Sequence, residues 1–146
     1  MQPPVNQLQI LVEGAPPLTL GHDQLFFAPR ASRVEDIGAL VPGRSGGGVR
    51  FSWLAAQARL PEGLGWVTLE STDGRFAASL EMEDLGAAIV VHADGARPFG
   101  SADGGPFRLY IPGANDACGN VKHLGRITFS SKPGADTRPP ESERTC

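Results

Sequence analysis

Glycine and proline occur along the whole of this chain, and their spread constrains the fold more than any single motif. The 146 residues include 19 glycines and 13 prolines. Together these are about 22% of the chain, against a usual share of roughly 12%. Because they are not gathered in one block, they predict many turns that join short strands rather than one long disordered region.

The segments between these turns carry the hydrophobic patterns of short strands and two short helices. Asp73-Gly74 and Asp94-Gly95 are sequences typical of tight turns. The spacing of Phe51, Leu54 and Ala58 by three and four residues indicates a helical face. We therefore predict an α+β fold of strand-rich mixed sheets with short helices. The expected strands are 8–12, 66–71, 76–80, 88–93, 107–111 and 126–130, with an extended stretch at 32–41 and helices at 22–27 and 50–59.

The length of the chain fits one domain, because domains commonly have about 100–150 residues. We assign this domain to residues 1–130. Residues 131–146 contain three prolines and no large apolar side chain. Such a segment buries too little surface to offset the entropy lost on ordering. We therefore predict that 131–146 is a disordered tail.

Charge and hydropathy argue against several classes of partner. The formal net charge is −3 and the pI is about 5.5, so neither a nucleic acid nor an anionic membrane would attract the chain over long range. No apolar run approaches the roughly 20 residues of a membrane-spanning helix. The first residues lack the basic and apolar regions of a secretory signal. We expect a cytoplasmic protein with no nucleic-acid partner and no membrane association.

Two further segments resemble functional motifs but fit them poorly. Gly43 and Gly48 have the spacing of a P-loop, yet Val49-Arg50 follows where a P-loop has lysine and then serine or threonine. This segment is interpreted as a flexible connecting loop, with anion contact as the alternative. Glu81, Glu83 and Asp84 form an acidic cluster that is typical of a solvated face.

The sequence predicts no metal site and identifies no catalytic residue. His22, His92 and His123 are far apart, and none has a second ligand two or four residues away. His92 lies in a hydrophobic run and is interpreted as a core residue. Cys118 and Cys146 are too few for a disulfide framework or a zinc site. Cys118 is either a plain loop cysteine or, with Lys122 nearby, a reactive thiol.

Two basic residues occur in otherwise apolar, strand-like stretches near the end of the chain. Arg108 lies within GGPFRLYIPG, and Lys122 lies within NVKHLGRI. Burial of either charge without compensation would cost several kcal/mol, so each side chain should meet an anion or a hydrogen-bond acceptor. A structural salt bridge from Arg108 to Asp73 or Asp103 is one solution. A bound anion, held by a guanidinium and an ammonium, is the other.

Residues 8–130 resemble the molybdopterin-binding domain of the sulfite oxidase superfamily, in order and without large gaps. The most specific pieces are GGPFRLYIPG, which is similar to the family pattern H-G-x-P-x-R-L-x-x-P-G, and NVKHLGRI, which is similar to V-K-W-L-x-R-I. STDGRFAASL is similar to S-x-D-G-x-x-x-S-L. The resemblance implies a sulfite-oxidase-type fold. It also implies that Arg108 and Lys122 bind a molybdopterin cofactor, together with Asp73, whose family counterpart lies near the same site.

This sequence departs from the family pattern at positions that matter for chemistry. Val41 stands where the resemblance implies the cysteine ligand of molybdenum. Asp103 replaces the histidine of H-G-x-P, and His123 replaces the tryptophan after the V-K lysine. A valine offers no lone pair, so molybdenum bound through a cysteine is not expected at this position, whereas a pterin without that bond remains compatible with the sequence.

Three functions are therefore considered. The first is a degenerate molybdopterin-binding protein that binds a pterin or another anionic small molecule without molybdenum–cysteine chemistry. The second is a small molybdopterin-dependent oxidoreductase, or a subunit of one, in which Cys118 or a partner supplies the metal ligand and a redox partner protein exchanges electrons. The third is a non-catalytic interaction module in which Arg108 and Lys122 form structural ion pairs.

Overall fold

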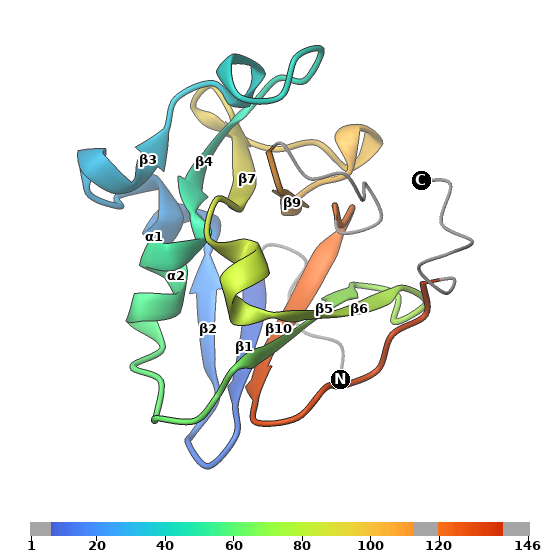
Figure 1. Cartoon of the computed structure of the whole chain (residues 1–146). Coiled ribbons are helices and arrows are strands. Elements are labelled where there is room, and N and C mark those ends of the chain that lie inside the picture. The colour runs from blue at the N-terminus through green and yellow to red at the C-terminus, as the bar shows by residue number, and fades with distance from the viewer. Residues whose placement is uncertain (1–6, 113–119, 139–146) are drawn as a thin grey trace.

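The computed structural model describes residues 7–112 and 120–138, apart from the side chain of Asp103. Two five-stranded sheets form most of this part of the chain, and in the view of Figure 1 one sheet lies in the lower half and the other above it. The predicted α+β, strand-rich organisation is therefore observed. No helix in the described ranges is long and apolar enough to cross a membrane.

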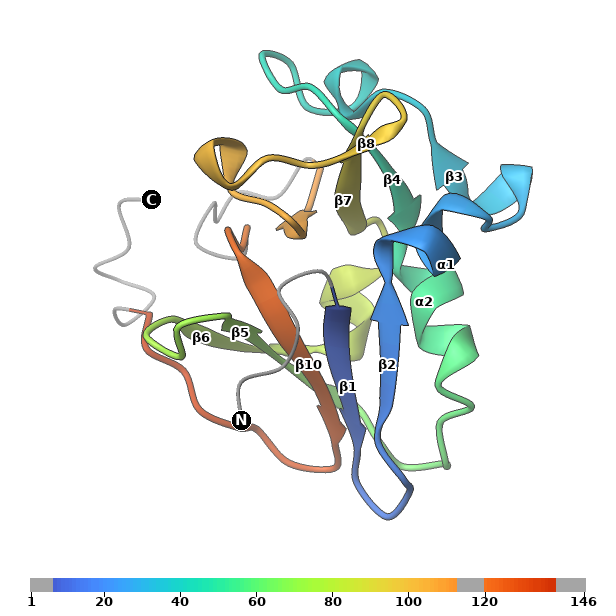
Figure 2. The ribbon, with the colours of Figure 1, turned by 180° about the vertical axis from the view of Figure 1, so that it is seen from behind.

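Sheet A, the lower sheet in Figure 1, joins strands from the two ends of the chain. Its order is β2-β1-β10-β5-β6. The bounds are β1 Gln7–Val12, β2 Leu18–Gly21, β5 Trp66–Ser71, β6 Ala77–Glu81 and β10 Leu124–Ser130. β1 and β10 are parallel, and the other neighbours are antiparallel. The pairing of β1 with β10 places the first and last strands side by side in the middle of the sheet, as the rear view in Figure 2 shows.

Sheet B, the upper sheet, is built around β7. Its strands are β3 Arg33–Val34, β4 Gly47–Arg50, β7 Ile89–Asp94, β8 Arg97–Pro98 and β9 Arg108–Tyr110. The order is β3-β4-β7-β8, and β9 pairs with β7 over the part of β7 that β8 does not cover. In this register Arg108 is opposite Val91 and Tyr110 is opposite Ile89, so these four side chains share one face of sheet B.

The helices are short. α1 is His22–Phe26, α2 is Phe51–Gln57, and single 3-10 turns form η1 Arg30–Ser32, η2 Ile37–Ala39, η3 Met82–Leu85 and η4 Ser101–Asp103. The apolar face predicted for α2 is confirmed, because Phe51 and Leu54 are buried and Ala55 and Ala58 pack against the same core.

Two hydrophobic clusters hold the sheets together, and β7 contributes to both. Val90 belongs to the large cluster formed with sheet A and α2, whereas Ile89 and Val91 belong to a smaller cluster. The smaller cluster, called the upper cluster below, consists of Val34, Ile37, Ile89, Val91, Phe99 and Tyr110. A strand covered on both faces needs a continuous apolar run, which explains the predicted buried strand at this position.

The segment after β10 differs from the prediction of a disordered tail over residues 131–138. This segment, the strap, runs back along β6, as Figures 1 and 2 show. The Ala77 amide donates to Thr137 Oγ1 (3.0 Å), and the Thr137 amide donates to the Ala77 carbonyl (2.8 Å). The Ser79 amide donates to Asp136 (3.2 Å). The unpaired edge of β6 offers backbone hydrogen-bonding groups, and bonds to them stabilise an ordered 131–138. The composition of the segment alone does not indicate these bonds. Residues 139–146 lie outside the described residues.

The stretch 32–41, predicted to be extended, is instead the short β3 followed by η2. Asp36 causes the change, because its carboxylate accepts a hydrogen bond from the Gly38 amide (2.9 Å) and starts the turn. The glycine segment that follows is only in part a loop. Gly47 and Gly48 belong to β4, and a Cβ on Gly48 would collide with the Val90 carbonyl of β7. Close strand packing, rather than flexibility, requires this glycine.

Candidate anion-binding site

Arg108 is a buried cation on sheet B. It is 7% exposed and lies on β9 between Phe107 and Leu109, which face the large cluster. Tyr110, two residues further on, shares the face of Arg108, and the guanidinium carbon lies 4.8 Å from the centre of the tyrosine ring. A contact of this kind between a guanidinium and an aromatic ring is a favourable cation–π interaction. Arg108 is therefore buried, the case in which its charge needs a compensating anion or acceptor.

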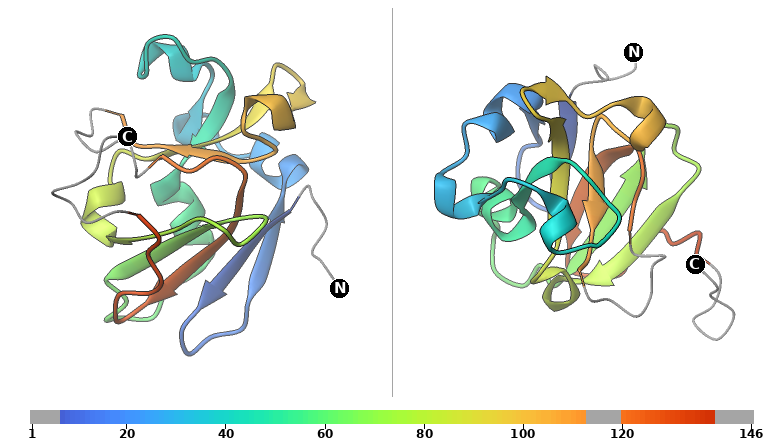
Figure 3. Two further views of the ribbon diagram at one scale, coloured as in Figure 1. Left: turned by 90° about the vertical axis from the view of Figure 1, so that its right-hand side faces the viewer. Right: turned by 90° about the horizontal axis from the view of Figure 1, so that it is seen from above.

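A second guanidinium approaches the same ring from another part of the chain. The guanidinium carbon of Arg44 lies 5.9 Å from the centre of the Tyr110 ring. Arg44 is exposed and belongs to the segment between η2 and β4. Seen from above in Figure 3, that segment lies over β7. Two cations on one ring concentrate positive charge at this face of sheet B, which favours an anion there.

Gly104 brings Arg108 and Lys122 together. A Cβ on Gly104 would lie 2.9 Å from Cδ and 3.0 Å from Nη1 of Arg108, and 3.3 Å from Cγ of Lys122. The two basic side chains therefore meet at Gly104 and occupy the position that a larger residue would need. Lys122 itself is exposed, so of the two only Arg108 is a buried cation. The reason is local: Val121 points inward and bridges to Leu109, and the chain turns at Lys122.

Backbone hydrogen bonds fix this arrangement. The His123 amide donates to the Gly104 carbonyl (2.6 Å), and the Gly104 amide donates to the Ser101 carbonyl (3.1 Å). The His123 ring nitrogen Nδ1 lies 2.8 Å from the Gly105 carbonyl. His123 thus connects the turn that carries Lys122 to the glycine segment beside Arg108. These hydrogen bonds hold the backbone of the two segments together and so position both cations.

Asp73 does not join this group in the structure. Its carboxylate accepts hydrogen bonds from the Ser71 hydroxyl (2.6 Å) and the Arg75 amide (2.9 Å), both within its own turn. These two hydrogen bonds lower the pKa of the carboxyl group below its ordinary value. The turn is nevertheless next to the site, because the amide of Thr72 donates to the carbonyl of His123 (2.8 Å).

Val41 is the residue that the resemblance in sequence places where the family has its cysteine ligand. Its side chain is half-buried and packs against the upper cluster, which contains Tyr110. A hydrocarbon side chain offers no metal ligand. The side chain of Asp103, and therefore the salt bridge considered for Arg108, lies outside what the structure describes. Cys118 and Cys146 are also outside the described residues.

Sequence reasoning missed a pair of histidines on the opposite side of β7. His22 begins α1 and His92 lies in β7, 70 residues later, yet their Nδ1 atoms are 3.0 Å apart. The interpretation of His92 as a core residue is correct, since it is 3% exposed. The separation in sequence hid the pair, and only the packing of α1 on β7 reveals it.

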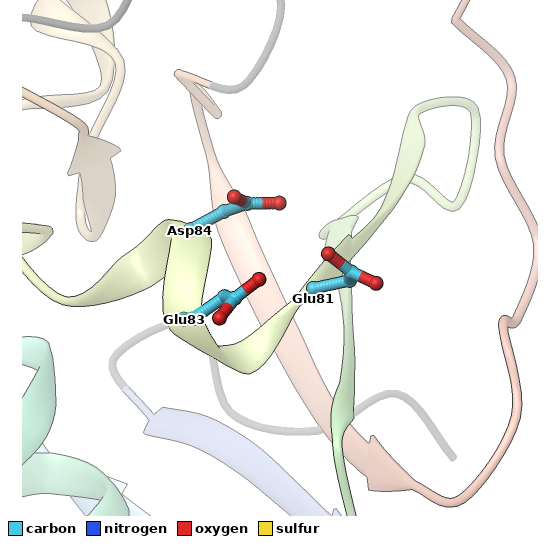
Figure 4. A group of neighbouring side chains, drawn as sticks. All are labelled: Glu81, Glu83 and Asp84. Atoms are coloured by element: carbon cyan, nitrogen blue, oxygen red, sulfur yellow. The ribbon is translucent and has the colours of Figure 1, made fainter.

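The acidic cluster lies away from these residues, at the junction of β6 and η3. Carboxylate oxygens of Glu81, Glu83 and Asp84 lie within 4.8 Å of one another, and Figure 4 shows the three side chains on the outer surface of this turn. All three residues are exposed. Exposed acidic groups of this kind are common as solvated faces, and the cluster is assigned no function.

A buried arginine, a neighbouring lysine and a glycine between them are thus carried by an α+β fold of one mixed and one antiparallel sheet. Comparison with known proteins specifies the class further. The family model of the oxidoreductase molybdopterin binding domain matches residues 44–137. The chain therefore belongs to this family, and the resemblance stated above is confirmed.

Among solved structures, the chain is similar to the sulfane dehydrogenase SoxCD from Paracoccus pantotrophus. The TM-score is 0.64 at 21% sequence identity, and the match covers 91% of this chain and 40% of that chain. At this identity the likeness establishes the fold, so the predicted sulfite-oxidase-type fold class is confirmed. The chain spans less than half the length of this neighbour. No curated protein matches the sequence.

Proposed function

We propose that this chain binds a molybdopterin-type cofactor through Arg108 and Lys122, without a metal–thiolate bond from position 41. The observation that carries the proposal is the convergence of Arg108 and Lys122 on Gly104, where atoms of both side chains lie within 3.3 Å of the Cβ position. Membership of the molybdopterin-binding family supplies the class of ligand. A cofactor of this class brings its own redox chemistry, and the protein supplies binding and orientation.

The two basic side chains at Gly104 suit an anionic group such as a phosphate. A guanidinium is planar and matches the paired oxygens of a phosphate, and that of Arg108 lies over the Tyr110 ring. Lys122 adds a charge on a flexible, exposed stem that starts at the same glycine. In this proposal Arg108 fixes the orientation of the anion, and Lys122 closes over it from the exposed side.

Asp73 would act in this proposal through the backbone rather than by contact with the ligand. Its carboxylate holds the turn in which Thr72 donates to the His123 carbonyl. His123 directly follows Lys122. Removal of the Asp73 carboxylate would therefore loosen the support of Lys122, and we assign Asp73 an indirect part in cofactor binding.

The donor set around position 41 does not suit molybdenum. The Val41 side chain packs against the upper cluster and carries no donor atom. We therefore derive no catalytic step at a metal held by this residue. The proposed protein is a degenerate member of its family, which retains the anion-binding side of the site and lacks the sulfur at the aligned position.

The test is retention of pterin by protein isolated from a host that makes the cofactor. Oxidation of the denatured protein converts the released pterin to a fluorescent product that can be quantified. Arg108→Leu and Lys122→Ala should each lower retention by about 10-fold or more, because each removes a charge-assisted hydrogen bond. Arg97→Leu, which replaces an exposed arginine of β8, should retain the pterin of the unchanged protein.

Loss of pterin in Arg108→Leu alone could result from misfolding, because Arg108 is buried. Lys122→Ala avoids this ambiguity, since Lys122 is exposed and its replacement leaves the core intact. Equal retention by unchanged protein, Arg108→Leu and Lys122→Ala would contradict the proposal. If no pterin is found in any of them and Arg108→Leu lowers stability, the interaction module is favoured instead.

A second candidate function is a subunit of a larger molybdopterin-dependent oxidoreductase. The observation that favours it is that SoxCD, the similar structure, is a dehydrogenase more than twice as long as this chain. A partner subunit or Cys118 would then supply the metal ligand, and a redox partner protein would exchange electrons. Molybdenum near one atom per chain in natively isolated protein would support this function. Loss of the metal in Cys118→Ala would identify the ligand.

A further inference from the structure

A β-bulge places His92 at a special position in β7. In the pairing of β4 with β7, Gly48 is opposite Val91 and Gly47 is opposite Ala93, so His92 is the extra residue between the two pairs. A bulge changes the direction of the side chain of its extra residue. Here the ring of His92 lines a cavity that α1, β3, β4 and β7 share.

The hydrogen bonds of the histidine pair determine which ring nitrogen of His92 carries the proton. Nδ1 of His22 lies 3.0 Å from the carbonyl oxygen of His92 and 3.0 Å from its Nδ1. Because a carbonyl only accepts, His22 donates from Nδ1, and Nδ1 of His92 presents its lone pair. Burial, and then the neighbouring His22, lowers the pKa of His92 from 6.5 to about 4, so its ring is neutral at pH 7. The proton of this neutral ring is therefore on Nε2.

The Nε2–H group of His92 is a donor that borders the cavity. The cavity has a volume of about 220 Å³, which is room for several water molecules. His92 lines it although the residue is only 3% exposed. Among the described residues Nε2 has no hydrogen-bond partner, yet it is not one of the side-chain atoms that are sealed from solvent. Since buried donors are normally paired, this group requires an acceptor that enters the cavity.

The other walls of the cavity combine a cation with apolar surface. Arg33 of β3 is exposed, so its guanidinium is free to turn toward a ligand. Phe26 of α1 is 38% exposed, and Val34 and Ala93 add hydrocarbon. An N–H donor with a guanidinium suits a carboxylate, and an aromatic side chain suits a flat apolar group that stacks on it.

Glu35 also lines the cavity and would favour a cationic ligand instead. An ammonium group, however, brings only donors, and a donor cannot satisfy the Nε2–H group of His92. That group would then stay unpaired in a buried position, which is unfavourable. Glu35 is exposed, so its carboxylate is able to remain in water when an anion is bound. The buried donor therefore decides the sign of the ligand.

We propose that this cavity binds a small aromatic carboxylate. Its carboxylate accepts a hydrogen bond from Nε2 of His92 and pairs with Arg33, and its ring packs on Phe26. Neither Arg108 nor Lys122 lines the cavity. The site is thus separate from the one proposed for the cofactor, and it does not depend on cofactor binding.

Titration with benzoate, followed by nuclear magnetic resonance of labelled imidazole nitrogens, tests the proposal. The free protein should show His92 protonated on Nε2, and benzoate should shift this resonance in a saturable way while that of His123 stays unchanged. Benzamide, benzylammonium and acetate should each bind about 5-fold more weakly or less, because each lacks the negative charge or the ring. A proton on Nδ1, no saturable shift, or binding of benzamide or benzylammonium as tight as that of benzoate would overturn the proposal.

Two variants test the walls, and both replace exposed side chains so that the core is left intact. Arg33→Gln and Phe26→Ala should each weaken benzoate binding about 3-fold or more, which is the scale of a single exposed charge pair or aromatic contact. Arg30→Gln is the matched control, because Arg30 is an exposed arginine of η1 that does not line the cavity. Equal benzoate affinity in Arg33→Gln, Arg30→Gln and the parent would contradict the assignment of Arg33.

Discussion

The Cβ position of Gly104 lies 2.9 Å from Cδ of Arg108, closer than real Cβ atoms approach a neighbour. Gly104 also has a φ of +96°, a conformation that other residues adopt only with strain. The glycine thus has two roles: it turns the chain, and it lets Arg108 and Lys122 pack where another side chain would stand. The first prediction separates these two effects.

Gly104→Ala should lower both stability and pterin retention. The backbone strain costs about 1–3 kcal/mol, and the new methyl group displaces Arg108. Gly63→Ala is the matched control, because Gly63 has a similar φ of +87° and nothing within 4 Å of its Cβ position. Denaturant unfolding should show a loss of stability in both variants, larger in Gly104→Ala because of the added clash, whereas pterin retention should fall only in Gly104→Ala. Equal retention in the two would show that the packing of Arg108 and Lys122 at Gly104 is not part of a ligand site.

Gly48→Ala tests whether the glycine segment is structural rather than a flexible loop. A Cβ on Gly48 would collide with the Val90 carbonyl, so β4 and β7 must separate. We expect a loss of more than about 3 kcal/mol in the free energy of unfolding, similar to other severe packing defects. Gly65→Ala, where nothing lies within 4 Å, should change stability little. A Gly48→Ala protein as stable as Gly65→Ala would restore the loop interpretation.

Stability should decrease as the pH falls from about 6.5 to about 4, and His92 should be a main cause. Its pKa is lowered from 6.5 to about 4, first by burial and then by His22. Between these pH values His92 is protonated in the unfolded chain but neutral in the folded chain, so a lower pH favours unfolding. The expected loss is on the order of 3 kcal/mol, at about 1.4 kcal/mol for each pKa unit, and most of it has occurred by pH 4.

Urea unfolding at several pH values measures this effect, with His92→Gln as the comparison. The free energy of unfolding of the variant should depend less steeply on pH between pH 6.5 and pH 4.

Asp136 also has a strongly lowered pKa, but it affects stability at lower pH than His92 does. Asp136 is partly buried, which opposes ionisation, but its hydrogen bonds with Arg138 and the Ser79 amide outweigh this and lower its pKa from 3.8 to about 2. Identical pH profiles for the parent and His92→Gln would contradict the assignment.

Asp136→Ala should open the edge of sheet A. The carboxylate accepts from the Ser79 amide and pairs with Arg138, whose Nη2 atom lies 2.7 Å from it. Its removal leaves the Ser79 amide without that acceptor, and we expect a loss of about 1–3 kcal/mol. Hydrogen exchange should accelerate at Ser79 and Ala77 in β6. Glu62→Ala, an exposed control, should leave both rates unchanged.

The sequence was sufficient for the elements whose pattern is local. The apolar run at β7, the helical spacing of α2 and the turns at Asp73-Gly74 and Asp94-Gly95 each follow from neighbours in the chain. The motif around Arg108 is also sufficient, without the fold, to indicate the family. Such features depend on short-range spacing and on the cost of burying a charge, both of which can be evaluated along one chain.

Only the tertiary structure decided what distant residues do together. It placed His22 against His92, brought Arg108 and Lys122 together at Gly104, and ordered 131–138 along β6. It also exposed Lys122, because Val121 takes the inward position beside Leu109. Each of these contacts joins segments that are far apart in the sequence. The interaction energy that stabilises them is available only after the sheets have packed and brought the segments together.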